Sequence, residues 1–126
     1  MKNKNPLYLV FITATLVSSL VLADGPLTIT TSGGCPTGVS SDGSCPAGYP
    51  GGAVCRDSGA RVRWISSGNA IQSIYKKPDS AGELQGCTSN GPAEYQCSAV
   101  GSSGTSINYN VQLDGCSVFD PTIIIR

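Results

Sequence analysis

Six cysteines constrain the fold of this chain more than any other feature of its sequence. Their number is even, which in a small chain is typical of a disulfide-stabilised protein from an oxidising compartment. Several of them are spaced ten residues apart, and the sequence leaves their pairing open. No two form a C-x-x-C motif and the chain contains no histidine, so we expect neither a metal site nor a cofactor. The six are Cys35, Cys45, Cys55, Cys87, Cys97 and Cys116.

The N-terminal segment has the pattern of a cleaved signal peptide. Lys2 and Lys4 precede an uncharged, largely apolar run over residues 7–22, and Ala23 supplies a small residue at the predicted cleavage site. A transmembrane anchor is the alternative, but the run is short for a membrane span and is followed at once by Asp24. We therefore expect residues 1–23 to be removed and the remaining chain, with every cysteine, to be secreted without a membrane anchor.

Removal of residues 1–23 changes the charge balance of the chain. The remaining 103 residues carry six basic and eight acidic side chains, which gives a net charge of −2. Nucleic-acid binding needs clustered basic side chains, and binding to an anionic membrane surface needs a basic amphipathic segment. The sequence shows neither, so we expect no nucleic-acid partner.

The part after the signal peptide divides into two regions of one domain. Residues 24–58 are rich in glycine, proline and serine, and they contain a C-P-x-G repeat at 35–38 and 45–48. Proline removes backbone donors and glycine raises the entropic cost of ordering the chain. We expect this region to be an ordered loop held by its cysteines, whose role is packing rather than recognition. Residues 59–126 are expected to form a β-rich core.

Alternation of apolar and polar residues predicts the strands of that core. The clearest case is 107–113, where the apolar residues alternate with amides and the run ends at an Asp-Gly turn signal. Residues 61–65 and 95–99 alternate in the same way, and 122–125 is a short apolar run after a proline. These patterns predict a mainly β fold, either a small antiparallel sheet or a sandwich, stabilised by disulfides.

Residues 70–77 are ambiguous between helix and strand. Ile71, Ile74 and Tyr75 share one face of a helix that Asn69 would cap and Pro78 would end. The alternative is a strand that leaves a turn at 67–69. We expect a short helix here, which would make the fold α+β.

No catalytic system is supported by the residues present. Without histidine, Ser-His-Asp and Cys-His systems are excluded, and oxidised cysteines offer no thiolate. Asp57-Ser58-Gly59 resembles the catalytic loop of aspartic proteases, but it follows Arg56 instead of an apolar segment, and this tripeptide is common in turns. Asp79 and Glu83 form a carboxylate pair of the kind glycosidases use, although a chain this short rarely builds a sugar cleft. We expect a protein that is not an enzyme.

Aromatic and basic side chains are the candidates for a binding surface. The single tryptophan could stack on a sugar ring or anchor a protein interface, although the only tryptophan of a small domain is more often in the core. Basic residues next to it in sequence could attract an acidic partner, although a solvated strand face is the simpler interpretation. The candidate surface comprises Arg61, Arg63, Trp64, Tyr75, Lys76 and Lys77.

These features together resemble those of small secreted cysteine-rich effector candidates of plant-associated fungi such as rusts. Tyr95-Gln96-Cys97 matches the aromatic-x-Cys tripeptide often noted among them. The resemblance implies a secreted protein that binds a host or competitor protein without catalysis. A carbohydrate- or cell-wall-binding module and a killer-toxin-like antimicrobial protein are the alternatives.

Overall fold

The computed structural model describes residues 24–40, 43–49 and 53–126. The predicted signal peptide, residues 1–23, lies outside the described residues. Within these ranges the chain forms nine strands and no helix, which confirms the prediction of a mainly β fold. The described part contains no helix with the length and apolarity needed to cross a membrane. The strands are β1 (Leu27–Ser32), β2 (Cys35–Val39), β3 (Val54–Arg56), β4 (Ala60–Ser66), β5 (Ile71–Lys76), β6 (Glu83–Ser89), β7 (Glu94–Val100), β8 (Ser106–Leu113) and β9 (Thr122–Ile125).

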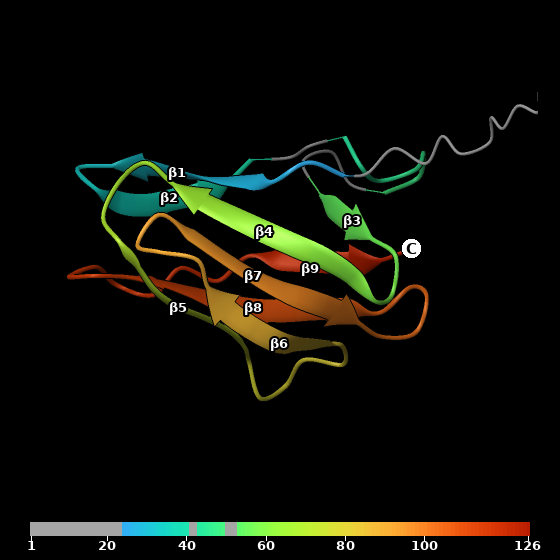
Figure 1. The fold of residues 1–126 in the computed structure, drawn as a ribbon. Coiled ribbons are helices and arrows are strands. Elements are labelled where there is room, and N and C mark those ends of the chain that lie inside the picture. Colours follow the sequence, from blue (N-terminus) through green and yellow to red (C-terminus); the bar gives the residue numbers. More distant parts are fainter. Residues whose placement is uncertain (1–23, 41–42, 50–52) are drawn as a thin grey trace, which may run out of the picture.

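The described strands form two sheets that face each other as two layers (Figure 1). One sheet has five strands in the order β2-β1-β4-β7-β6, and the other has four in the order β3-β9-β8-β5. Each sheet contains one parallel pair, β1 with β4 and β3 with β9, beside its antiparallel pairs. The arrangement is therefore a sandwich of two mixed sheets, and not the purely antiparallel sheet that the sequence also allowed.

The core lies between the two sheets and follows from the alternation along the strands. On β8 every second residue, from Ile107 to Leu113, is buried, while the amide side chains between them are half-buried on the outer side. On β4 the residues Val62 and Trp64 are buried, and Arg61 and Arg63 are exposed. The strands predicted at 61–65, 95–99, 107–113 and 122–125 are confirmed as β4, β7, β8 and β9.

The helix predicted over residues 70–77 is wrong, because this segment is strand β5. Ile71 pairs with Leu113 and Ile74 pairs with Val111, but the register shifts between Ile71 and Ser73. This irregularity adds one residue to β5 relative to β8, as in a β-bulge, so that Ile71 and Ile74 both face the core. A spacing of three between buried residues therefore arises in a strand, where it imitates the period of a helix.

The prediction of a loop over residues 24–58 is also wrong in part, because β1, β2 and β3 lie in this region. β1 alternates in the usual way, with Leu27 and Ile29 fully buried. β2 tolerates Pro36 because it is an edge strand, where a missing backbone donor faces no neighbour. Pairing between strands thus outweighs the unfavourable local composition.

Three disulfides connect the six cysteines, all of which are described. Cys45–Cys55 and Cys87–Cys97 each join cysteines ten residues apart. The remaining bond joins Cys35 on β2 to Cys116 after β8, across a sequence separation of 81, and so links the two sheets. A disulfide framework in a chain of this size is consistent with an extracellular location.

Candidate functional site

The six residues predicted as a binding surface divide between the two sheets. Arg61 and Arg63 point outward from β4, which lies in the middle of the five-stranded sheet. Tyr75, Lys76 and Lys77 lie on or directly after β5, at the edge of the four-stranded sheet. The structure therefore does not bring the two basic groups together on one surface.

Trp64 belongs to the core, which corrects its prediction as a surface residue. Its side chain is fully buried and faces Tyr109 across the sandwich, with ring centroids 5.4 Å apart. The indole Nε1–H donates to the Tyr109 hydroxyl over 3.0 Å. Burial raises the pKa of Tyr109 well above its ordinary value. The indole N–H of Trp64 and the hydroxyl of Tyr109 would each be costly to bury without a partner, and here they satisfy each other.

Both lysines next to Tyr75 form ion pairs. The Lys76 ammonium lies 3.6 Å from the Glu83 carboxylate, so it connects β5 to β6 where the two sheets meet. The Lys77 ammonium donates to Asp120 over 2.9 Å. This hydrogen bond lowers the pKa of Asp120 and raises the pKa of Lys77. The basic character of this part of the surface is therefore largely neutralised by carboxylates.

The outer side of the four-stranded sheet forms a regular array, which we call the tyrosine face. Tyr75 pairs directly with Asn110 on β8, and Ser73 pairs with Gln112. The bridge between Val111 and Phe119 places Val118 and Asp120 beside β8, along the edge of that strand that does not pair with β5. The tyrosine face consists of Ser73, Tyr75, Lys77, Asn108, Asn110, Gln112, Val118, Asp120 and Thr122.

The tyrosine face holds the exposed large hydrophobic side chains of the described part of the chain. Tyr75 is 44% exposed and Val118 is 46% exposed, and no other large hydrophobic side chain among the described residues is classed as exposed. Tyr75 lies on β5 and Val118 directly precedes Phe119, which bridges to the other edge of β8, so about two strand spacings, or about 10 Å, separate the two positions. Both side chains thus lie on one surface, with the amides of β8 between them.

The amides on β8 differ in how they are engaged. The Gln112 side-chain amide donates to the backbone carbonyls of Leu113 and Cys116. The side-chain Oδ1 of Asn108 accepts a hydrogen bond from the Thr122 hydroxyl. The Asn110 side chain, next to Tyr75, has no hydrogen-bond partner among the described residues. A half-buried amide beside an exposed aromatic ring is a group that a ligand can satisfy.

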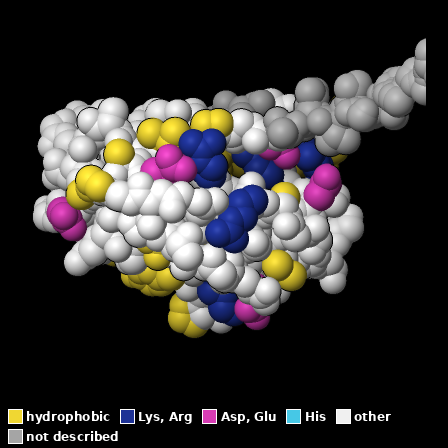
Figure 2. Space-filling model, viewed as in Figure 1, with side chains coloured by type: hydrophobic (Ala, Val, Ile, Leu, Met, Phe, Trp, Pro, Cys, Tyr) yellow, Lys and Arg dark blue, Asp and Glu magenta, His cyan; other side chains and the backbone are white. Residues whose placement is uncertain are grey.

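The outer side of the five-stranded sheet is a second surface, which we call the arginine face. Figure 2 shows this side of the molecule: most of it is uncharged polar side chain or backbone, and the basic side chains lie apart from one another. Arg63 donates to Glu94 over 2.8 Å, and this hydrogen bond lowers the pKa of Glu94. The face consists of Arg61, Arg63, Ile65, Gln85, Thr88, Glu94, Gln96 and Ser98.

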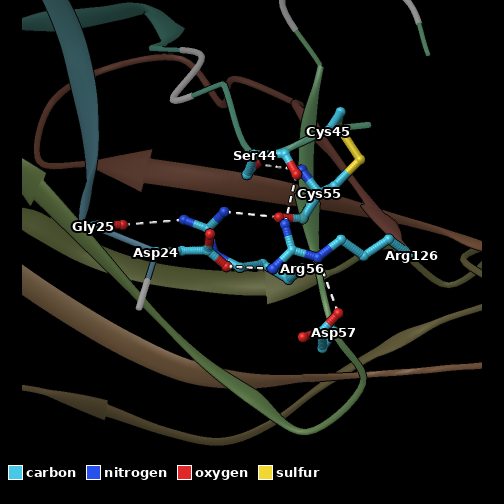
Figure 3. Close-up of polar contacts among 8 residues, drawn as sticks. All are labelled: Asp24, Gly25, Ser44, Cys45, Cys55, Arg56, Asp57 and Arg126. Atoms are coloured by element: carbon cyan, nitrogen blue, oxygen red, sulfur yellow. Dashed lines mark hydrogen bonds and ion pairs between the residues drawn. A yellow bond between two sulfur atoms is a disulfide. The ribbon is translucent and has the colours of Figure 1, made fainter. Parts of the chain in front are cut away.

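The aspartate of the protease-like tripeptide belongs to a different cluster. Asp57-Ser58-Gly59 forms the turn from β3 to β4, and the Asp57 carboxylate accepts from Arg126 Nε over 2.9 Å. Arg126 also binds Asp24, whose carboxylate lies 3.7 Å from buried Arg56 (Figure 3). The tripeptide thus serves as a turn. The ion pair between its Asp57 carboxylate and Arg126 attaches the last described residue to the end of β3.

The carboxylates considered for glycosidase chemistry are also placed. Glu83 starts β6 and pairs with Lys76, and Asp79 lies exposed in the connection before it. Among the described residues no group of three or more histidine, cysteine or acidic side chains is arranged to hold a metal ion.

The sequence pattern contained part of the tyrosine face. Asn108, Asn110 and Gln112 are the polar half of the alternation over 107–113, and this alternation places all three on one side of a strand. Val118 carries no comparable signal, because its position beside Gln112 depends on pairing after a turn. On the arginine face, Gln96 and Ser98 likewise join Arg61 only through pairing of β4 with β7.

Comparison with protein-family models, with curated proteins and with solved structures found no match to this chain.

Proposed function

We propose that this chain is a secreted, non-enzymatic binding protein that recognises a host or competitor protein through the tyrosine face. Residues 1–23 direct its export, and the disulfide framework suits the compartment in which it acts. The proposal agrees with the effector-type resemblance of the sequence. The observation that carries it is the placement of Tyr75 and Val118, the two exposed large hydrophobic side chains of the described residues, on one sheet face.

The apolar part of the tyrosine face supports a protein partner. Binding energy at protein interfaces is concentrated in a few anchors, and tyrosine is among the residue types most enriched in that role. Tyr75 offers a large ring with few rotatable bonds, so its immobilisation has a small entropic cost. Val118 adds an aliphatic group across the same face.

The polar part of the face supplies specificity. The unengaged Asn110 amide can donate to and accept from a partner backbone, and its site is fixed by the pairing with Tyr75. The Lys77–Asp120 pair at the edge of the face carries no net charge. Such a rim does not repel partners of either sign, and it leaves the central anchors to decide affinity.

The alternative of a carbohydrate-binding module at this same face is less well supported. Stacking along a sugar chain needs a row of exposed aromatic rings, and within the described residues Tyr75 is the only aromatic side chain that is classed as exposed. Trp64 is buried and cannot stack on a ligand, so its fluorescence reports on the fold.

The test uses protein secreted from the full-length chain, whose N-terminus is sequenced first and should be Asp24. Wild type, Tyr75→Ala, Val118→Ser and the control Gln72→Ala are immobilised and exposed to a plant extracellular protein extract. Gln72 is exposed on the same strand, but it lies at the register shift and lacks the pairing with β8 that places Ser73 and Tyr75 next to the amides of that strand. We expect wild type and Gln72→Ala to retain a protein from the extract that Tyr75→Ala and Val118→Ser do not retain. Once that protein is purified, each of the two variants should bind it at least ten-fold more weakly than wild type does, which is the size typical of an interface anchor.

Three outcomes would contradict the proposal. The first is that Gln72→Ala loses the partner as fully as Tyr75→Ala. The second is that no retained protein depends on Tyr75 or Val118. The third is that insoluble chitin or β-glucan binds the protein in a Tyr75-dependent manner, which would assign the face to a polysaccharide.

A further inference from the structure

Arg61 is held rigidly at the centre of the arginine face. Its Nε donates to the side-chain oxygen of Gln96 over 3.1 Å, and its Nη1 donates to Ser98 Oγ over 3.1 Å. Nη1 also lies 3.5 Å from the Gly86 carbonyl oxygen. Three neighbouring strands, β4, β7 and β6, therefore fix one guanidinium on a flat surface. A guanidinium held in this way loses little side-chain entropy when it binds a ligand.

An irregularity of β6 contributes to this arrangement. The register between β6 and β7 shifts between Gln85 and Thr88, and Gly86 adopts a φ of 58°, which glycine tolerates. Bulges of this kind redirect backbone and side-chain groups next to functional sites. Here the redirected group is the Gly86 carbonyl that accepts from Arg61.

The charge of Arg61 is not neutralised by the described part of the protein. Each of the other basic side chains there lies within 4 Å of a carboxylate, whereas the hydrogen bonds of Arg61 to described residues go only to neutral oxygens. Its Nη2 group has no acceptor among the described residues. The arginine face thus presents one unpaired positive charge, on a chain whose secreted part is acidic overall.

The surroundings of Arg61 indicate what kind of anion fits. Gln85, Gln96, Ser98 and Thr88 are neutral groups that donate and accept hydrogen bonds. Neither of the exposed large hydrophobic side chains lies on this face, because both belong to the tyrosine face. A protein partner would find only the half-buried Ile65 as an apolar contact here, whereas a polyhydroxylated chain would find donors and acceptors around Arg61.

We propose that the arginine face binds a carboxylated polysaccharide, that is, a polymer of uronic acid residues. Arg61 donates through Nη2 to a sugar carboxylate, and the neighbouring amides and hydroxyls bind the ring hydroxyls. Charge complementarity determines that the polymer must be anionic. This site is independent of the proposed function, because it lies on the opposite side of the sandwich from Tyr75.

The experiment measures binding of a galacturonate oligomer of defined length by calorimetry, with its methyl ester as the neutral counterpart. Wild type should bind the acid form and not the ester, and its affinity should fall as salt screens the charge. Arg61→Gln should reduce affinity by roughly ten- to hundred-fold, the range for loss of a charge-assisted hydrogen bond. Arg61→Lys should recover part of it, because a lysine keeps the charge but not the planar fork.

Lys76→Gln is the charge-matched control. It removes one positive charge at the sandwich edge, outside both faces, and should leave affinity within about two-fold of wild type, the size of a weak surface electrostatic effect. Amide chemical-shift changes on titration should fall on β4, β6 and β7. Unchanged thermal unfolding of Arg61→Gln shows that the fold is intact, as expected for an exposed side chain.

Several results would overturn the proposal. Equal loss in Lys76→Gln would mean non-specific attraction, and equal binding of the ester would mean that the carboxylate is not recognised. Equal, Arg61-dependent binding of a polyglutamate peptide would assign the face to an acidic protein. Absence of galacturonate binding, or shift changes confined to β5 and β8, would remove the site from the arginine face. Tyr75→Ala separates the two proposals, since it should lower the affinity for the protein partner and leave the affinity for galacturonate unchanged.

Discussion

At the scale of single residues, burial decides which polar side chains are structural. Trp64 and Tyr109 come from opposite sheets, and the hydrogen bond between them is the polar contact at the centre of the core. Each group would leave the other unsatisfied if it were removed. The only tryptophan of the chain therefore holds the two layers in register and is unavailable for binding.

This pair gives a test by double-mutant cycle. Trp64→Phe removes the donor and leaves a cavity, so we expect a loss of about 2 to 4 kcal/mol in the free energy of unfolding. Tyr109→Phe should have a smaller effect, of about 1 to 2 kcal/mol, because it preserves the ring. The double variant should be more stable than the sum of the two losses implies, as measured by urea unfolding followed by circular dichroism. Strict additivity would show that the hydrogen bond contributes nothing.

At the scale of elements, prediction from the sequence succeeded where alternation was regular. The alternation predicts β8 and β4 correctly, because in both strands apolar residues face the core and the polar residues between them face outward. β5 was mistaken for a helix because a register shift places Ile71 and Ile74 on one side. β1 to β3 were missed because glycine and proline are unfavourable locally, and only pairing with β4 and β9 compensates for them. The tyrosine face was likewise predictable only in part. The alternation along β8 indicates that its amides share one side, but the position of Val118 depends on pairing between distant residues.

The turn between β1 and β2 allows a matched comparison of two glycines. Gly33 and Gly34 both have positive φ, but only at Gly34 would an added Cβ collide, with the Asn69 side chain. That side chain donates to the Asp114 carbonyl over 3.0 Å, and so connects this turn to the end of β8. Gly33→Ala should cost about 1 to 2 kcal/mol from backbone strain alone, and Gly34→Ala about 1 to 2 kcal/mol more. Equal destabilisation in thermal or urea unfolding would show that Asn69 moves aside without loss.

At the scale of the whole molecule, the disulfides differ in how much of the chain they constrain. Cys45–Cys55 and Cys87–Cys97 close short loops, whereas Cys35–Cys116 closes most of the described chain. The chain-entropy model predicts a larger effect on the unfolded state for the longer loop. The bond between β2 and the segment after β8 should therefore contribute most to stability.

Paired cysteine-to-serine variants test this order. Removal of Cys35–Cys116 should lower the free energy of unfolding by about 4 to 5 kcal/mol, against about 2 to 3 kcal/mol for Cys45–Cys55. Urea unfolding under non-reducing conditions measures both, with wild type as reference. The opposite order would mean that local strain or residual structure outweighs loop length.

The parallel pairing of β3 with β9 has a consequence for the time at which the molecule folds. Val54 pairs with Ile123, so the edge of the four-stranded sheet is completed by residues that are synthesised almost 70 positions later. Contacts between such distant residues are slow to form, because a long loop must close before any interaction compensates for it. The cysteines of the two short-range disulfides are present before the chain is complete, whereas Cys116 and β9 are synthesised late. The sheet that carries Tyr75 is therefore expected to be completed last, only after the whole described sequence has been synthesised.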